Sequence, residues 1–269
     1  MQSPAHLFLQ KSQGLIDCVQ SQIPAIQTAA DWFAETILAR RMVHLFGSGH
    51  SRIMVEEMWP RYGSFPGFHP IVELSLTFHN QVVGANGQRQ AMFLENTTGL
   101  AARILRNFDL SKADSALIIS SSGCNVVPIE MAEGFQSIGM KVVGIVSQKH
   151  ADVSISRHPK SLKLTDVCDL VLDTGAPAGD AMVKLDHLET PVSPGSTIGG
   201  CLIINAIKAE VAARLTLAGM PPFVLTAAST VGPEKASELF ENAYDEHAHR
   251  LSDLYRNVGQ KSQSTEMKS

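Results

Sequence analysis

Three consecutive serines lie where an apolar segment of strand length meets the start of a helical pattern. Residues 116–119 are apolar, the next six are Ser120-Ser121-Ser122-Gly123-Cys124-Asn125, and a helix is predicted from Val126 onward. The first backbone N–H groups of a helix have no partner inside it, and the helix dipole makes that end positive. One serine would suffice to cap the start of the helix. Three consecutive serines followed by Gly-Cys-Asn instead favour a site that binds an anion.

A second loop rich in glycine and hydroxyl groups follows the apolar residues 42–46 and reads Gly47-Ser48-Gly49-His50-Ser51. Its two glycines are spaced as in a dinucleotide-binding fingerprint. The third glycine of that fingerprint is replaced by Arg52, which argues against a nicotinamide cofactor. The sequence also contains no G-x-x-x-x-G-K-[ST] motif, so a nucleoside triphosphatase loop is excluded.

Alternating strands and helices must position these loops. Nearly continuous apolar strands that alternate with helices predict an α/β fold: a doubly wound, mainly parallel five-stranded sheet with helices on both faces. The carboxyl ends of parallel strands meet at one edge, so the polar loops are expected to lie together there, with the Gly/Pro-rich stretch 175–195. The predicted strands are 42–46, 68–74, 116–119, 141–147 and 168–173, and the main predicted helices are 53–58, 88–108, 126–139, one from 196 and 233–255.

Three parts are expected along the 269 residues. Residues 1–40 predict an N-terminal helical arm of two helices, broken near Pro24, that packs across a partner subunit. Residues 41–256 form a single α/β domain, and residues 257–269 are a polar tail. The arm is too short to fold as a DNA-reading domain with its own core.

Composition narrows the classes of function. The chain is 44% hydrophobic and 18% charged with a net charge of -4, which indicates a folded protein and disfavours a nucleic-acid partner. Four scattered cysteines predict reduced thiols, no structural zinc and a cytoplasmic location. The N-terminus lacks the layout of a signal peptide. The most apolar helical stretch, 199–218, carries three charged side chains, so no membrane span is expected.

Several motifs in the same order resemble the SIS (sugar isomerase) domain family, and within it proteins related to phosphoheptose isomerase. The resemblance covers roughly residues 5–250 and is carried by the segments 46–51, 82–90, 119–123, 139–145 and 177–181. It implies a doubly wound domain that binds a phosphosugar and forms a homodimer or homotetramer with sites near subunit interfaces. In the heptose enzymes a histidine of the last core helix is the partner acid, and this chain has no histidine there. Ile53, one turn before Glu57, means that the zinc pair of some members is missing, so neither a metal nor another cofactor is expected.

The resemblance also implies which residues contact the substrate. Within the serine-rich turn Asn125 stands where the family usually has Ser or Thr, so phosphate and another anion both remain open. The implied substrate-binding residues are Ser48, Gly49, His50 and Ser51 in the first loop, Ser120, Ser121, Ser122 and Asn125 in the serine-rich turn, and Ser196 and Thr197 at the start of the last core helix.

Isomerisation of an aldose to a ketose requires a base over C1 and C2, and a carboxylate whose pKa is raised by burial would serve. Two glutamates are candidates by resemblance. Glu57 lies in Glu56-Glu57-Met58, similar to the Glu-Glu-Leu of phosphoheptose isomerases, and Glu95 begins a Glu-x-Thr-x-Gly pattern like that of aminosugar isomerase domains. His79 and His50 are the candidates for the partner acid.

The leading hypothesis is therefore an aldose–ketose isomerase that acts on a phosphorylated or otherwise anionic sugar through an enediol. Two alternatives remain. The first is a non-catalytic sensor or regulatory protein that binds a phosphosugar, and the second is an amino-sugar phosphate lyase that uses the same fold and a glutamate.

Overall fold

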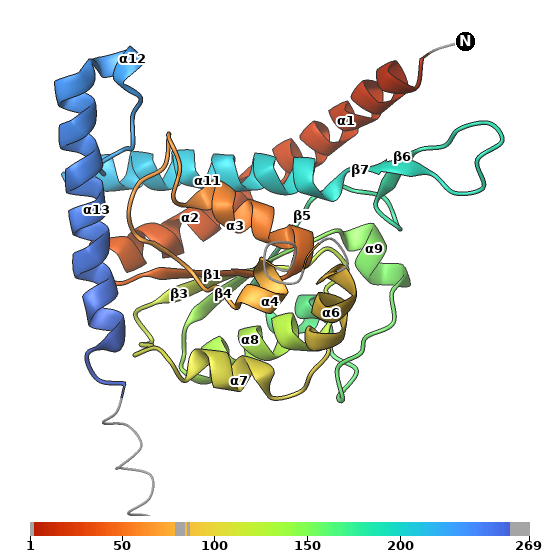
Figure 1. Cartoon of the computed structure of the whole chain (residues 1–269), viewed down its shortest axis with the longest axis horizontal. Helices are drawn as coiled ribbons and strands as arrows, with labels where there is room; N and C mark the ends of the chain where they lie inside the picture. The colour runs from red at the N-terminus through yellow and green to blue at the C-terminus, as the bar shows by residue number, and fades with distance from the viewer. Residues whose placement is uncertain (1–2, 79–83, 85–86, 259–269) are drawn as a thin grey trace, which may run out of the picture.

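Five parallel strands form the central sheet of the computed structural model, which describes residues 3–78, 84 and 87–258. Their order across the sheet is β2-β1-β3-β4-β5 (Figure 1). Every residue of β1 and β3 is buried, as expected for strands covered on both faces. The strands are β1 Val43–Gly47, β2 Phe68–Pro70, β3 Ser115–Ile119, β4 Lys141–Val146 and β5 Leu170–Asp173.

Helices cover both faces of this sheet. Successive strand residues point to opposite faces, so Leu45 packs in one hydrophobic cluster and Phe46 in the other. The first cluster contains buried residues of α2 (Ile23–Leu38), α3 (Arg52–Met58) and α11 (Ser196–Leu217). The second contains residues of α7 (Leu100–Leu105), α8 (Val126–Ser137) and α10 (Leu164–Val167). This arrangement confirms the predicted doubly wound α/β sheet.

The two N-terminal helices have different surroundings. Helix α2 lies within the core, and its Ala29, Ala30 and Phe33 are fully buried. Helix α1 (Pro4–Ser21) extends beyond the sheet toward the hairpin of β6 (Ala181–Val183) and β7 (Val192–Pro194) (Figure 1). Within the expected arm, α1 is therefore the part that projects from the sheet.

Several local elements differ from the sequence prediction. The expected strand 68–74 ends at Pro70, and α4 (Leu74–Thr77) follows, because the Glu73 carboxylate caps it by accepting from the Leu76 N–H at 2.8 Å. The expected helix 88–108 is divided into α6 (Gly87–Leu94) and α7 by a turn that contains Gly99 at φ +84°. Besides α4, the described elements that were not predicted include the 3-10 turn Gly49–Ser51, α9 (Gln148–Val153), α10, α12 (Ala228–Val231) and the β6–β7 hairpin.

Helix α13 (Pro233–Tyr255) has the predicted bounds and stands across one end of the sheet (Figure 1). Its first residue is a proline, which costs no hydrogen bond in the first turn. Among the residues that the structure describes, no helix is both long and apolar enough to cross a membrane.

Candidate active site

A crevice is expected where the strand order reverses. The chain passes from β1 to β2 on one side and later places β3 on the other side of β1, so the loops after β1 and β3 diverge at the carboxyl edge of the sheet. Ligands of doubly wound sheets bind at this point. The loop after β1 begins at Ser48 and the loop after β3 begins at Ser120.

The structure brings all ten predicted substrate-binding residues to one cavity of about 700 Å³ at this edge. Glu95 lines the same cavity. The residues from the sequence prediction that line it are Ser48, Gly49, His50, Ser51, Glu95, Ser120, Ser121, Ser122, Asn125, Ser196 and Thr197.

The amino end of α8 has the features of an anion site. Asn125 is its N-cap residue, but the Asn125 side chain forms no capping hydrogen bond, and the first turn holds no acidic residue. The buried Oγ of Ser121 has no hydrogen-bond partner among the described residues. Gly123 adopts φ +63°, which lets the turn fold back toward the helix. The start of α8 and the three serines before it therefore line the same cavity.

The second helix start in the cavity, that of α11, is already occupied. Asp180 Oδ1 accepts hydrogen bonds from the backbone N–H groups of Gly195 at 3.0 Å and Ser196 at 2.7 Å. Its Oδ2 accepts from Ser196 Oγ at 2.7 Å. This carboxylate neutralises the positive end of α11, whereas no acidic side chain lies in the first turn of α8, so the start of α8 is open to a ligand anion.

Glu95 follows the last residue of α6. Ser48 Oγ donates to Glu95 Oε2 at 2.8 Å, and the backbone N–H of Val127 donates to the carbonyl oxygen of Glu95 at 2.9 Å. Burial raises the pKa of the Glu95 carboxyl above its usual value, although Ser48 and Arg157 act in the opposite direction. A half-buried carboxylate of raised pKa is a stronger base than an exposed one.

Glu57, the other candidate base, does not line this cavity. Its carboxylate accepts from Asn205 Nδ2 at 2.8 Å and from Arg61, and Lys208 Nζ lies 3.9 Å away. Burial alone would raise the pKa of Glu57, but the hydrogen bonds from Asn205 and Arg61 outweigh burial and lower it. Glu57 thus holds α3 against α11. The third catalytic candidate, His79, lies outside the described residues.

Among the cavity residues that the sequence interpretation missed, Arg157 and His150 have basic side chains. Arg157 lines the cavity, and its backbone N–H donates to the carbonyl oxygen of Cys124 at 2.9 Å. His150, in α9, also lines the cavity, and its buried Nδ1 has no partner among the described residues. Both follow β4, and the same carboxyl-edge argument applied to that strand would have included them.

The chain is similar to several known proteins. The family model described as SIS domain matches residues 8–147. A UPF0309 protein of Listeria innocua is 31% identical over 241 residues, which cover 90% of this chain and 91% of that protein. A UPF0309 protein of Halalkalibacterium halodurans is 31% identical over 230 residues, which cover 86% of this chain and 93% of that protein. A solved structure of a phosphoheptose isomerase from Francisella tularensis aligns with a TM-score of 0.49 at 15% identity, covering 78% of this chain and 98% of that one.

Proposed function

The chain belongs to the SIS domain family, and from this premise we propose that it is an aldose–ketose isomerase of a phosphorylated sugar. One observation carries the proposal. A glutamate of raised pKa and an uncapped helix start rich in hydroxyl groups face the same cavity. The first has the chemistry of a general base, and the second has the chemistry of an anchor for the sugar's anionic end.

The phosphate would bind at the start of α8. Ser120, Ser121 and Ser122 offer hydroxyl donors there, and the side chain of Arg157 lines the same cavity. A guanidinium binds phosphate oxygens through charge-assisted hydrogen bonds, roughly twice as strong as neutral ones. The anchored phosphate leaves the carbonyl end of the open-chain sugar to reach Glu95.

Proton transfer would proceed through an enediol. The Glu95 carboxylate takes the proton from C2 while the C1 carbonyl oxygen gains a proton, which gives the enediol. Glu95 then returns its proton to C1 as the hydroxyl on C2 loses its proton, which gives the ketose. Ser48 donates to Oε2, so Oε1 is the oxygen left to reach the carbon. His50 and His150 line the cavity and are the groups proposed to move the proton between O1 and O2.

The test is hydrogen exchange at C2. The protein is incubated with a panel of aldose and ketose phosphates in deuterated water, and deuterium at C1 and C2 is followed by NMR. Glu95→Gln should reduce exchange at least about 100-fold, the usual contribution of a general base. Glu57→Gln is the matched control and should retain exchange. Loss of exchange in Glu57→Gln with no loss in Glu95→Gln would refute the assignment, provided both variants melt near the wild-type temperature.

The same panel separates the alternatives. Sugar phosphates that raise the melting temperature without any exchange would indicate a sensor. Formation of an unsaturated sugar with release of an alcohol from an ether substrate, or of an amine, would indicate a lyase.

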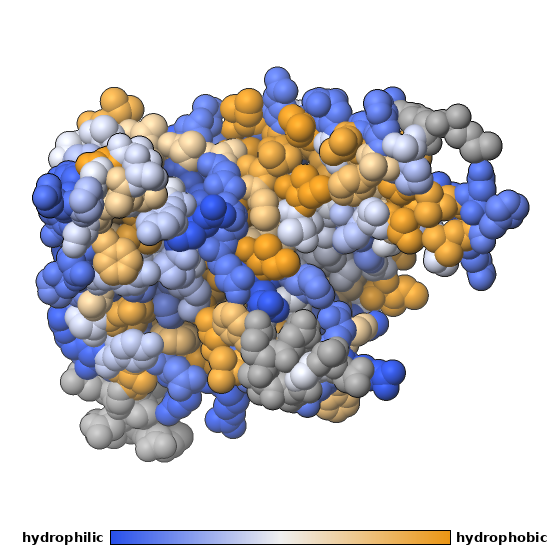
Figure 2. Space-filling view, turned by 45° about the horizontal axis from the view of Figure 1, so that its top comes forward, coloured by the Kyte–Doolittle hydropathy of each residue, from blue (hydrophilic) through white to orange (hydrophobic). Residues whose placement is uncertain are grey.

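We also propose that the protein is a homo-oligomer joined through the side of the molecule that carries α1 and α11. Apolar residues gather in patches on this side (Figure 2). Ile16 and Ile23 are 42% and 45% exposed there, and they line a groove of about 510 Å³ with Leu202 of α11. Such exposed apolar patches mark protein interfaces.

Light scattering after size-exclusion chromatography tests this interface. A double variant Ile16→Glu/Ile23→Glu should be monomeric. The control Ile138→Glu, on the opposite face of the sheet, should keep the wild-type mass. If the double variant keeps the wild-type mass, this face is not the subunit interface.

A further inference from the structure

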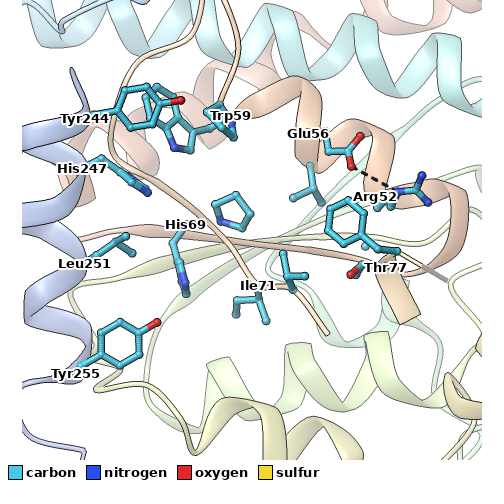
Figure 3. Close-up of a pocket in the computed structure, with 16 residues that line it drawn as sticks. Arg52, Glu56, Trp59, His69, Ile71, Thr77, Tyr244, His247, Leu251 and Tyr255 are labelled. Carbon is cyan, nitrogen blue, oxygen red and sulfur yellow. Dashed lines mark ion pairs between the residues drawn. The ribbon is translucent and has the colours of Figure 1, made fainter. Parts of the chain in front are cut away.

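A second cavity lies on the other side of the segment that forms the first loop of the active site. It measures about 390 Å³ and is bounded by α3, the end of β2 and α13 (Figure 3). The active-site cavity is lined by residues 48–51, whereas this one is lined by Gly47 and Arg52 at either end of that loop. The two cavities share no lining residue within the part of the chain that the structure describes, so the second is treated as a separate space.

Aromatic and aliphatic side chains form most of its walls. Trp59 follows the last residue of α3, and Tyr244, Leu251 and Tyr255 project from α13 toward the same space (Figure 3). Arg52 lies over the ring of Phe78, 5.3 Å from its centroid, and pairs with Glu56 at 3.5 Å. A mostly apolar cavity of a few hundred Å³ with a small number of polar groups is typical of small-molecule sites.

One of these polar groups is His69, which is only 6% exposed. His69 and His44 occupy paired positions in β2 and β1, and their Nδ1 atoms are 2.9 Å apart. Nε2 of His44 lies 3.7 Å from the carboxylate of Asp114. Burial alone would raise the pKa of Asp114, but His44 and Arg41 outweigh burial and lower it to about 2, so the carboxylate is charged.

This chain of groups sets the tautomer of His69. The charged Asp114 favours a proton on Nε2 of His44, which leaves Nδ1 of His44 as an acceptor in the neutral pair. Nδ1 of His69 must then donate across the 2.9 Å contact. Nε2 of His69 is left without a proton, so this ring offers an acceptor to a molecule in the cavity that it lines.

The second polar group is His247, which extends from α13 toward the cavity (Figure 3). Its buried Nδ1 has no hydrogen-bond partner among the described residues. A buried polar atom without a partner destabilises the fold unless a ligand or another group satisfies it. The His247 ring centroid lies 5.2 Å from that of Trp59, so an aromatic ring and a residue with an unsatisfied polar atom line the same space.

We propose that this cavity is a second small-molecule site that binds a planar, bicyclic heteroaromatic molecule with an N–H donor. The flat ring packs between the aromatic walls, and its N–H donates to Nε2 of His69. His247 forms the second polar contact. Adenine and indole share this chemistry but come from different sources, nucleotides and tryptophan.

Calorimetric titration of the full-length protein with adenine and with indole tests the proposal. At least one of the two should bind with a Kd below about 1 mM, and which one binds identifies the source. 1-Methylindole has the shape of indole but lacks the N–H, so it should bind at least 10-fold more weakly. Adenine binding should also quench Trp59 in Trp32→Phe, where Trp59 is the remaining tryptophan.

Variants locate the site. His247→Phe keeps a ring beside Trp59 but removes the polar atom, and should weaken binding at least 10-fold. His249→Phe, an exposed position on the same helix, is the matched control and should bind like wild type. Val72→Phe narrows the cavity without altering either histidine, because Val72 lines it and is 47% exposed. Absence of binding by both probes, or equal binding by His247→Phe, Val72→Phe and His249→Phe, would overturn the proposal.

Discussion

The hydroxyl of Ser48 sets the strength of the proposed base, and its removal has a calculable effect. Ser48 Oγ donates to Glu95 Oε2 at 2.8 Å and stabilises the charged carboxylate. A hydrogen bond to a charged group contributes about 1.5 kcal/mol at the lower end of its range. One pKa unit corresponds to about 1.4 kcal/mol. Ser48→Ala should therefore raise the pKa of Glu95 by about one unit.

The assay is the pH profile of C2 exchange for the best substrate of the panel. Glu95 acts as a base only when it is charged, so the acidic limb of kcat/KM reports its pKa in the free protein. In Ser48→Ala this limb should move about one unit toward higher pH. Ser122→Ala, at the anion site, should weaken binding and leave the limb in place. An acidic limb that stays in place in Ser48→Ala, or moves to lower pH, would refute the role of Glu95.

Three further predictions concern the scaffold and the anion site. The pKa of Asp114 is lowered to about 2 from 3.8, so its carboxylate contributes about 2 kcal/mol to the free energy of unfolding above pH 4, and this contribution is lost as the pH falls toward 2. Denaturant titrations at pH 5 and pH 2 should show this loss in the wild type and not in Asp114→Asn. A Cβ on Gly199 would lie 2.0 Å from the carbonyl oxygen of Thr174, so Gly199→Ala should lower the free energy of unfolding by about 2 kcal/mol or more. The control Gly14→Ala, in an exposed part of α1 with no neighbour within 4 Å, should raise it by about 0.5–1 kcal/mol, and equal effects would contradict the packing argument. Arg157→Gln should weaken sugar-phosphate binding at least about 10-fold in calorimetry, and unchanged affinity would exclude Arg157 from the anion site.

Local patterns in the sequence predicted most of the fold and the two main loops of the site. The serine-rich turn could be recognised because strand, hydroxyl groups and helix start are contiguous in the chain. The start of α13 could be recognised because a proline begins it. The choice between Glu57 and Glu95 could not be made from the sequence. Glu57 lies on the side of α3 that faces Asn205 and Lys208 of α11, and that side is set by tertiary packing.

The remaining features depend on which strands are neighbours. His44 and His69 are 25 residues apart, and their contact follows from the pairing of β1 with β2. Arg157 reaches the cavity because the loop after α9 runs back to Cys124, which no short-range pattern indicates. The capping of α11 by Asp180 likewise requires the β6–β7 hairpin, which brings residue 180 beside residue 195.

The hydrogen bond from the Val127 N–H to the Glu95 carbonyl has a consequence for substrate choice. Val127 belongs to the first turn of α8, where the phosphate is proposed to bind, so this backbone hydrogen bond connects the phosphate site directly to the residue proposed as the base. The distance between the phosphate site and Glu95 is therefore fixed by the fold. A sugar with one carbon more or fewer between phosphate and carbonyl would bind equally well at its anionic end, yet present the wrong carbon to the base. Selection by chain length would thus appear in kcat more than in affinity.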